Sequence, residues 1–149
     1  MSILHQEKLT QAQINSIKDV SSRLGIKDPS WLTMVIHKET GGTFSPSIQN
    51  PRNGATGLIQ FTRTTAKELG TTIDALKRMS FTEQMNYVYK YFSRFKRGYN
   101  SFFDVYFAVF LPLLYGKPDS YEIPDKYYKG NAGIDLNKNG KITVAEFKQ

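Results

Sequence analysis

Glu39 is the residue of this chain best placed to do chemistry, because it is an acid at the end of an apolar helical stretch. Glu39 follows Leu32, Val35 and Ile36 at helical spacing, so its carboxyl group shares the face that these side chains bury. Desolvation and the negative end of the helix dipole both raise the pKa of a carboxyl group in this position. A carboxylic acid still protonated near neutral pH is the general acid that glycosidic bond cleavage requires. The alternative is an ordinary surface glutamate in a last helical turn.

A glycine-containing segment follows at residues 54–61, Gly-Ala-Thr-Gly-Leu-Ile-Gln-Phe. Its two glycines allow positive φ angles or close approach of a ligand, and Gln60 offers a donor and acceptors for sugar hydroxyl or acetamido groups. Taken alone, the segment also fits a plain loop that leads into the next helix. Together with residues 39–44, it resembles the signature of the lysozyme-like lytic transglycosylases, a Glu-Ser-Gly-type helix end followed by a Gly-Leu-Met-Gln-type turn. Thr40 replaces the family's serine and Ile59 its methionine.

The resemblance implies cleavage of the bond between N-acetylmuramic acid and N-acetylglucosamine in peptidoglycan. Glu39 would protonate the glycosidic oxygen, then take the proton of the muramoyl 6-hydroxyl to give a 1,6-anhydro product. A second carboxylate is not needed, because the substrate acetamido group can stabilise the positive centre. A hydrolytic muramidase on the same fold and a noncatalytic wall-binding module are the alternatives. The resemblance also implies that the substrate is bound at Thr40, Gly57, Leu58, Ile59 and Gln60.

Aromatic side chains are frequent between residues 81 and 119. Most of them are expected in the core, because their spacing is helical, and one or two at a groove could stack on sugar faces. Tyr87 and Phe110 are the candidates for that role. Segments 82–88, 108–112 and 116–119 resemble a branch of the same family that is common in bacteriophages. That family often has an Ala-Tyr-Asn-type motif where this chain has Ala-Val-Phe at 108–110.

A second motif, near the C-terminus, matches the calcium-binding loop of EF-hands. It has an acid at position one, amides at three and five, glycine at six and glutamate at twelve. The predicted ligands are Asp135, Asn137, Asn139, the Lys141 carbonyl and Glu146. With two carboxylates, the loop is expected to bind structural Ca²⁺ weakly, at about 0.1–1 mM, and to hold residues 130–149 onto the domain. A metal-free Asn-Gly turn is the alternative.

Helical signals cover the rest of the chain, and no stretch alternates as a strand does. The expected helices span residues 10–24, 29–39, a short segment from Thr62 or Thr65 to about Gly70, 72–79, 81–95, and 101–116 with an interruption at Pro112. We therefore expect a mostly α, lysozyme-like single domain over residues 1–149, with its site in a groove between helices. Residues 130–149 form a calcium-loop extension in this interpretation.

Composition and net charge limit the classes of molecule that this protein is expected to bind. The chain has 149 residues and a formal net charge of +7, which suits an anionic partner such as bacterial peptidoglycan. Nucleic acid fits less well, because the basic cluster at residues 94–97 belongs to no known binding module. With no cysteine and two histidines, thiol catalysis and a histidine metal cluster are excluded, and His37 is expected to be structural.

Neither a signal peptide nor a membrane-spanning segment is evident in the sequence. We therefore expect the protein to be made in the cytosol, without membrane insertion. We also expect it to be a monomer. It would reach the wall after release through a pore, or as a component of a virion.

Overall fold

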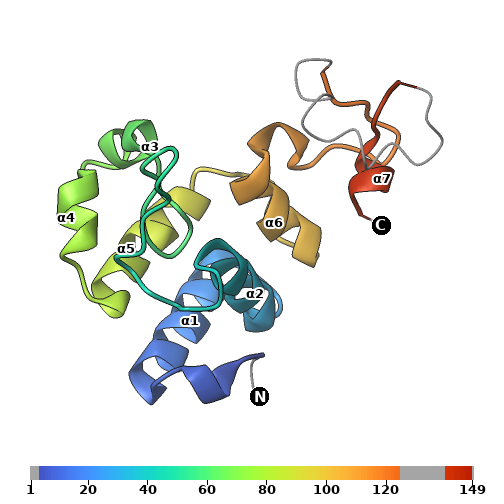
Figure 1. The fold of residues 1–149 in the computed structure, drawn as a ribbon. Helices are drawn as coiled ribbons and strands as arrows, with labels where there is room; N and C mark the ends of the chain where they lie inside the picture. Colours follow the sequence, from blue (N-terminus) through green and yellow to red (C-terminus); the bar gives the residue numbers. More distant parts are fainter. Residues whose placement is uncertain (1–3, 125–139, 149) are drawn as a thin grey trace. The chain divides into compact units, whose positions relative to one another are not determined.

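The computed structural model describes residues 4–124 and 140–148, and within them it is helical, without strands (Figure 1). This confirms the prediction of a mostly α fold. Along the chain the elements are η1 (Gln6–Lys8), α1 (Gln11–Leu24), α2 (Pro29–Glu39), α3 (Arg63–Glu68), α4 (Ile73–Lys77), α5 (Phe81–Phe92), α6 (Phe102–Phe110), η2 (Pro112–Leu114) and α7 (Val144–Phe147). None of the helices in the described ranges is long and apolar enough to cross a membrane.

Side-chain caps set the starts of α1, α2 and α5, and those of α2 and α5 were predicted from the sequence. Thr10 and Gln13 form a reciprocal capping box at the start of α1, and Ser80 and Glu83 form another at the start of α5. The Asp28 carboxylate accepts a hydrogen bond of 2.9 Å from the Ser30 amide at the start of α2. Each cap satisfies backbone amides that have no partner inside the helix, which is worth about 1 kcal/mol.

The predicted end of α5 at Phe95 is wrong, since the helix ends at Phe92. The Tyr99 hydroxyl donates to the Phe92 carbonyl, and the two rings pack edge to face with centroids 5.6 Å apart. Both side chains are buried, so the chain has to turn back soon after Phe92 to bring Tyr99 to this position. The burial of a second aromatic ring therefore outweighs the local helical pattern.

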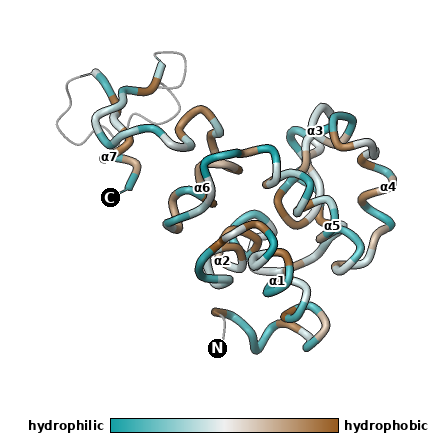
Figure 2. The backbone as a smooth tube through the Cα atoms, turned by 180° about the vertical axis from the view of Figure 1, so that it is seen from behind, coloured by the Kyte–Doolittle hydropathy of each residue, from teal (hydrophilic) through white to brown (hydrophobic). Residues whose placement is uncertain are grey.

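The chain divides into two compact units, Met1–Tyr106 and Phe107–Gln149. In the first unit α1 packs against α5 and α2. Apolar side chains of all three helices form its core, with Ile17 on α1, Val88 on α5 and Ile36 on α2 fully buried. The hydropathy colouring of Figure 2 shows the apolar stretches of α1, α2 and α5. Each fully buried aliphatic side chain contributes about 1.5–3 kcal/mol to folding.

The second unit is built on backbone pairing between two separate segments. The Ile123 amide donates to the Ile142 carbonyl at 2.8 Å, and the Val144 amide donates to the Tyr121 carbonyl at 2.9 Å. The Phe147 ring on α7 contacts the ring of Phe110, with centroids 5.8 Å apart. Residues 140–148 are thereby fixed to residues 110–123 of the same unit.

Candidate active site

The Glu39 carboxyl group lies at the C-terminal end of α2, and its side chain is half-buried. Burial raises the pKa of this carboxyl group, and the charge of Lys38 opposes the shift only in part. Lys38 is itself engaged elsewhere, because its Nζ donates to the Tyr106 hydroxyl at 2.8 Å and lies 4.5 Å from the centre of that ring. The pattern that singled out Glu39 in the sequence thus corresponds to a carboxyl group in poorly solvated surroundings.

Glu39 opens into a cavity of about 380 Å³, which we call the Glu39 cavity. It is lined by Glu39, Thr40, Gly41, Ile48, Gln49, Asn50, Pro51, Arg52 and Gln60. The structure therefore brings Glu39 and Gln60 to one cavity from separate segments of the chain. Among these lining residues Glu39 is the only carboxylate, and three of the others carry side-chain amides. An acid surrounded by amide donors and acceptors is suited to a polar, uncharged ligand such as a sugar.

Gln60 stands in a tight turn that closes residues 56–61. The Thr56 amide donates to the Phe61 carbonyl at 2.9 Å, and the Phe61 amide donates back to Thr56 at 2.8 Å. Inside the turn, Gln60 has a φ of 57°, a left-handed conformation that residues other than glycine seldom adopt. Its Nε2 donates to the Gly57 carbonyl at 3.0 Å and to the Ile48 carbonyl at 3.3 Å, which stabilises that conformation. The donor side of Gln60 thus holds the turn, and its Oε1 is the atom available for a ligand.

Gln84 on α5 holds the same turn in place. It is fully buried, and its Oε1 accepts a hydrogen bond of 2.7 Å from the Leu58 amide. Its Nε2 donates to the carbonyls of Pro46, at 2.8 Å, and Leu76, at 3.1 Å. Gly57 has a φ of 86°, and a Cβ there would collide with the Gln84 carboxamide. Gly57 is therefore required for the close approach of Gln84.

Thr40, Leu58 and Ile59, which the resemblance places among the substrate-binding residues, have side chains in the protein interior. The Thr40 hydroxyl donates to the Ile36 carbonyl at 2.8 Å and accepts from the Phe44 amide at 2.9 Å, which closes the end of α2. Leu58 and Ile59 pack in the core of the first unit. Of these three residues Thr40 lines the Glu39 cavity and the other two do not, and the polar groups of the cavity include the amides of Gln49, Asn50 and Gln60.

Tyr91 on α5 is a residue that the sequence did not identify as part of the site. Burial raises the pKa of its hydroxyl, and the negative charges of Glu39 and Glu68 add to the shift, which Arg94 opposes. The Arg94 guanidinium lies 4.4 Å from the centre of the Tyr91 ring and 3.8 Å from the Glu68 carboxylate. The negative charge of Glu39 thus raises the pKa of the Tyr91 hydroxyl. Its place one helical turn after Tyr87 is the signal that could have identified it.

The two aromatic candidates for sugar stacking occupy different units. Tyr87 on α5 is half-buried, and the Lys90 Nζ lies 4.7 Å from the centre of its ring. Phe110 belongs to the second unit, is 39% exposed and packs against Phe147. Neither lines the Glu39 cavity, and their contact with substrate stays a prediction.

His37 has structural contacts. Its ring stacks on the ring of His5, with centroids 4.0 Å apart, and packs against Phe44 at 5.5 Å. Burial and the charges of His5 and Lys8 lower the pKa of His37, which favours the neutral ring. A neutral, stacked imidazole fits the structural role expected of it.

The predicted calcium loop is only partly within the described residues. Asp135, Asn137 and Asn139 lie outside them, and no group of three or more His, Cys, Asp or Glu side chains in the described part could hold a metal ion. Ile142, the apolar position of the motif, is fully buried. The Glu146 carboxylate accepts a hydrogen bond of 3.0 Å from the Thr143 amide at the start of α7. The all-oxygen donor set suits Ca²⁺, and the site stays a prediction.

Comparison with known proteins gives no family assignment. Neither a protein-family model nor a curated protein nor a solved structure matches this chain.

Proposed function

We propose that this protein cleaves the β-1,4 bond between N-acetylmuramic acid and N-acetylglucosamine in bacterial peptidoglycan, as a lytic transglycosylase. The observation that carries the proposal is the half-buried Glu39 carboxyl group, whose pKa is raised by burial and which opens into a cavity otherwise free of carboxylates. The resemblance of residues 39–44 and 54–61 to the lytic transglycosylase signature supports the same assignment. The net charge of +7 suits a wall that carries peptide carboxylates.

In the proposed reaction, protonated Glu39 donates its proton to the glycosidic oxygen as the bond from that oxygen to the anomeric carbon breaks. The N-acetylglucosamine side leaves as an alcohol, and Glu39 becomes a carboxylate. This carboxylate then removes the proton of the muramoyl 6-hydroxyl, whose oxygen bonds to the anomeric carbon. Glu39 ends protonated, the product is a 1,6-anhydro sugar, and no water is consumed. The substrate acetamido oxygen stabilises the positive centre between the two steps.

The remaining parts of the proposal concern the setting of this reaction. Ca²⁺ bound at residues 135–146 would hold the C-terminal segment in place and take no part in the chemistry. The protein would act on the wall after release through a membrane pore, or as a virion component.

Mass spectrometry of the products tests the proposal directly. The protein is incubated with purified peptidoglycan and calcium, and the soluble fragments are weighed. Muropeptides that end in 1,6-anhydromuramic acid are expected. Reducing-end products heavier by one water would instead establish a hydrolase, and a lack of fragments would favour a wall-binding module.

Two matched variants assign the chemistry to the site. Glu39→Gln keeps the shape of the side chain but removes the acid, so lysis should be lost while binding to peptidoglycan is retained. Glu7→Gln makes the same change at an exposed position in η1 and should leave lysis intact. Lysis that survives the substitution of Glu39 would disprove the assignment.

A further inference from the structure

A second, larger hollow adjoins the Glu39 cavity. It has a volume of about 660 Å³ and lies where α3 and α4 meet, and we call it the α3–α4 pocket. It is lined by Gln49, Arg63, Lys67, Thr71, Thr72, Ile73, Asp74 and Lys77. Gln49 lines both hollows, so the two hollows are neighbours at this residue.

The α3–α4 pocket is cationic. Arg63 and Lys67 lie one helical turn apart on α3, Lys77 ends α4, and Asp74 is the one acid among the lining residues. Within the described part of the chain, Arg63 and Lys67 form no ion pair. The Lys77 Nζ donates to the Gln49 Oε1 at 3.3 Å, beside the junction of the two hollows. Three cations face one carboxylate, and none of the three forms an ion pair with a described residue, which favours an anionic group in this pocket.

We propose that the α3–α4 pocket binds the free carboxylates of the peptide stem attached to the muramic acid that occupies the Glu39 cavity. This inference rests on the proposed function. The stem starts on the sugar whose bond Glu39 would cleave, and four extended residues reach at most about 14 Å. Its carboxylates can therefore extend beyond Gln49 while the sugar stays beside the acid. The pocket would then select strands that carry peptide stems.

The test removes charge separately from the substrate and from the protein and compares the effects on binding. One batch of purified peptidoglycan, stripped of wall polymers, is divided, and the stem carboxylates of one half are converted to amides with carbodiimide and ammonia. The Glu39→Gln protein, which should bind without cutting, is titrated against both halves by co-sedimentation. We expect the native half to bind more tightly, by about two- to fivefold for each pocket cation in contact with a carboxylate.

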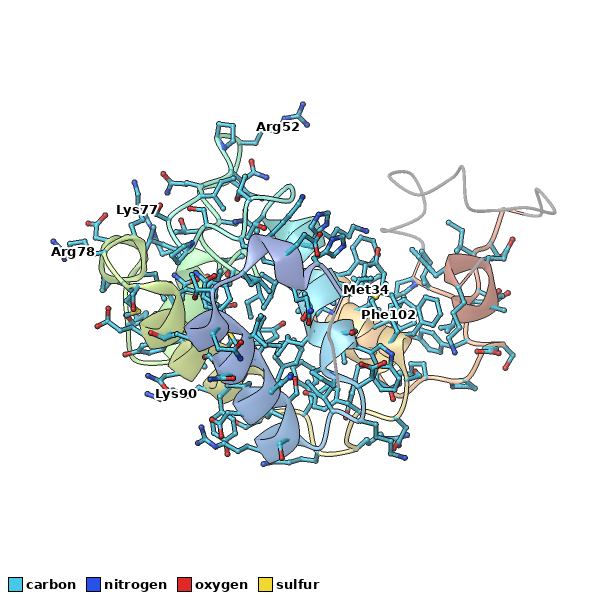
Figure 3. The ribbon with its side chains drawn as sticks, turned by 90° about the horizontal axis from the view of Figure 1, so that it is seen from below. Met34, Arg52, Lys77, Arg78, Lys90 and Phe102 are labelled. Carbon is cyan, nitrogen blue, oxygen red and sulfur yellow. The ribbon has the colours of Figure 1, made fainter. Side chains whose placement is uncertain are left out.

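Paired variants isolate the pocket from the overall charge of the protein. In the Glu39→Gln background, Arg63→Gln with Lys67→Gln should abolish the preference for native stems. Lys18→Gln with Lys27→Gln removes the same charge outside both hollows and should leave it intact. Lys77→Gln and Arg78→Gln form a second pair, since the side chains of these two neighbours at the end of α4 point in different directions (Figure 3), and of the two Lys77 alone lines the pocket.

Different results would disprove the pocket assignment and the proposed function. A preference that persists in the Arg63 and Lys67 double variant, or that disappears equally in the Lys18 and Lys27 control, overturns the pocket assignment. Wall polymer phosphates would be the true ligand if only unstripped peptidoglycan discriminated between these two double variants. A failure of the wild-type protein to release fragments disproves the proposed function, and the binding comparison still decides whether the pocket reads stem carboxylates.

Discussion

Replacing Gln84 with leucine should destabilise the first unit far more than a polar-to-apolar change usually does. Leucine is similar in size and suits a buried position, so lost volume is not the cause of the effect. The cost comes chiefly from the Leu58 amide, whose buried hydrogen bond to Gln84 is lost, whereas the Leu76 carbonyl keeps the hydrogen bond from the Met79 amide. An unsatisfied buried backbone amide costs about 1–3 kcal/mol. The Pro46 carbonyl is only partly buried and can turn to water.

Urea unfolding followed by circular dichroism measures this loss. At an m value of about 1–3 kcal/mol/M, a loss of 3 kcal/mol lowers the unfolding midpoint by about 1–3 M. Gln11→Leu is the matched control, because Gln11 is exposed on α1, and it should change the free energy of unfolding by less than about 0.5 kcal/mol. Equal midpoints for the two variants would refute the role given to Gln84.

Gln84→Glu provides an independent check on the hydrogen-bond argument. A protonated glutamic acid keeps the acceptor and offers one donor in place of glutamine's two, whereas a carboxylate offers acceptors alone to the two carbonyls. We expect a large loss of stability at pH 7 that shrinks relative to wild type as the pH falls through the raised pKa of the buried carboxyl group and is smallest below about pH 4. Equal losses at both pH values would show that shape, and not hydrogen bonding, governs this position.

The other predictions concern the site and the calcium loop. Burial raises the pKa of Glu39 above its ordinary value of 4.5, so the folded state holds this proton more tightly and loses stability as the pH rises through the raised pKa. Glu39→Gln should therefore melt higher than wild type at pH 7 and equally below about pH 4; equal melting at both would contradict the buried-acid argument. Thr40→Val should cost about 1–3 kcal/mol in urea unfolding, with Thr40→Ser close to wild type, because the hydroxyl bonds to two backbone groups. Gly57→Ala should cost at least about 1 kcal/mol from its φ of 86° alone, and a stable variant would mean that the turn can rearrange. Calcium should raise the melting temperature, and melting that is the same with chelator would count against the loop at residues 135–146.

Local signals predicted much of the helical structure. The starts of α2 and α5 at Asp28 and Ser80 could be predicted because a cap and its partner lie within a few residues in sequence, and α1 was predicted from its apolar face. The buried face that ends at Glu39 was predicted for the same reason, since one helix contains the whole pattern. The end of α5 was missed because it depends on Tyr99, which lies outside the helix.

The construction of the Glu39 cavity could not be read from the sequence. Gln84 looks like one more polar residue on an amphipathic helix, yet its bonds reach residues as many as 38 positions away. Tyr91 was one of many aromatic side chains, and only the fold places it within electrostatic reach of Glu39. Both depend on contacts between distant segments, which periodicity and spacing do not encode.

In the proposed reaction, a cavity whose lining carries a single carboxylate leaves the positive charge to be stabilised by the substrate itself. The group that would do so is the acetamido group of the sugar. Many chemical changes to a cell wall leave this group intact, whereas deacetylation removes its acetyl part. Bacteria that deacetylate their muramic acid should therefore resist this protein even where it binds their wall normally, so the chemistry of the wall, more than access to it, would set the range of susceptible cells.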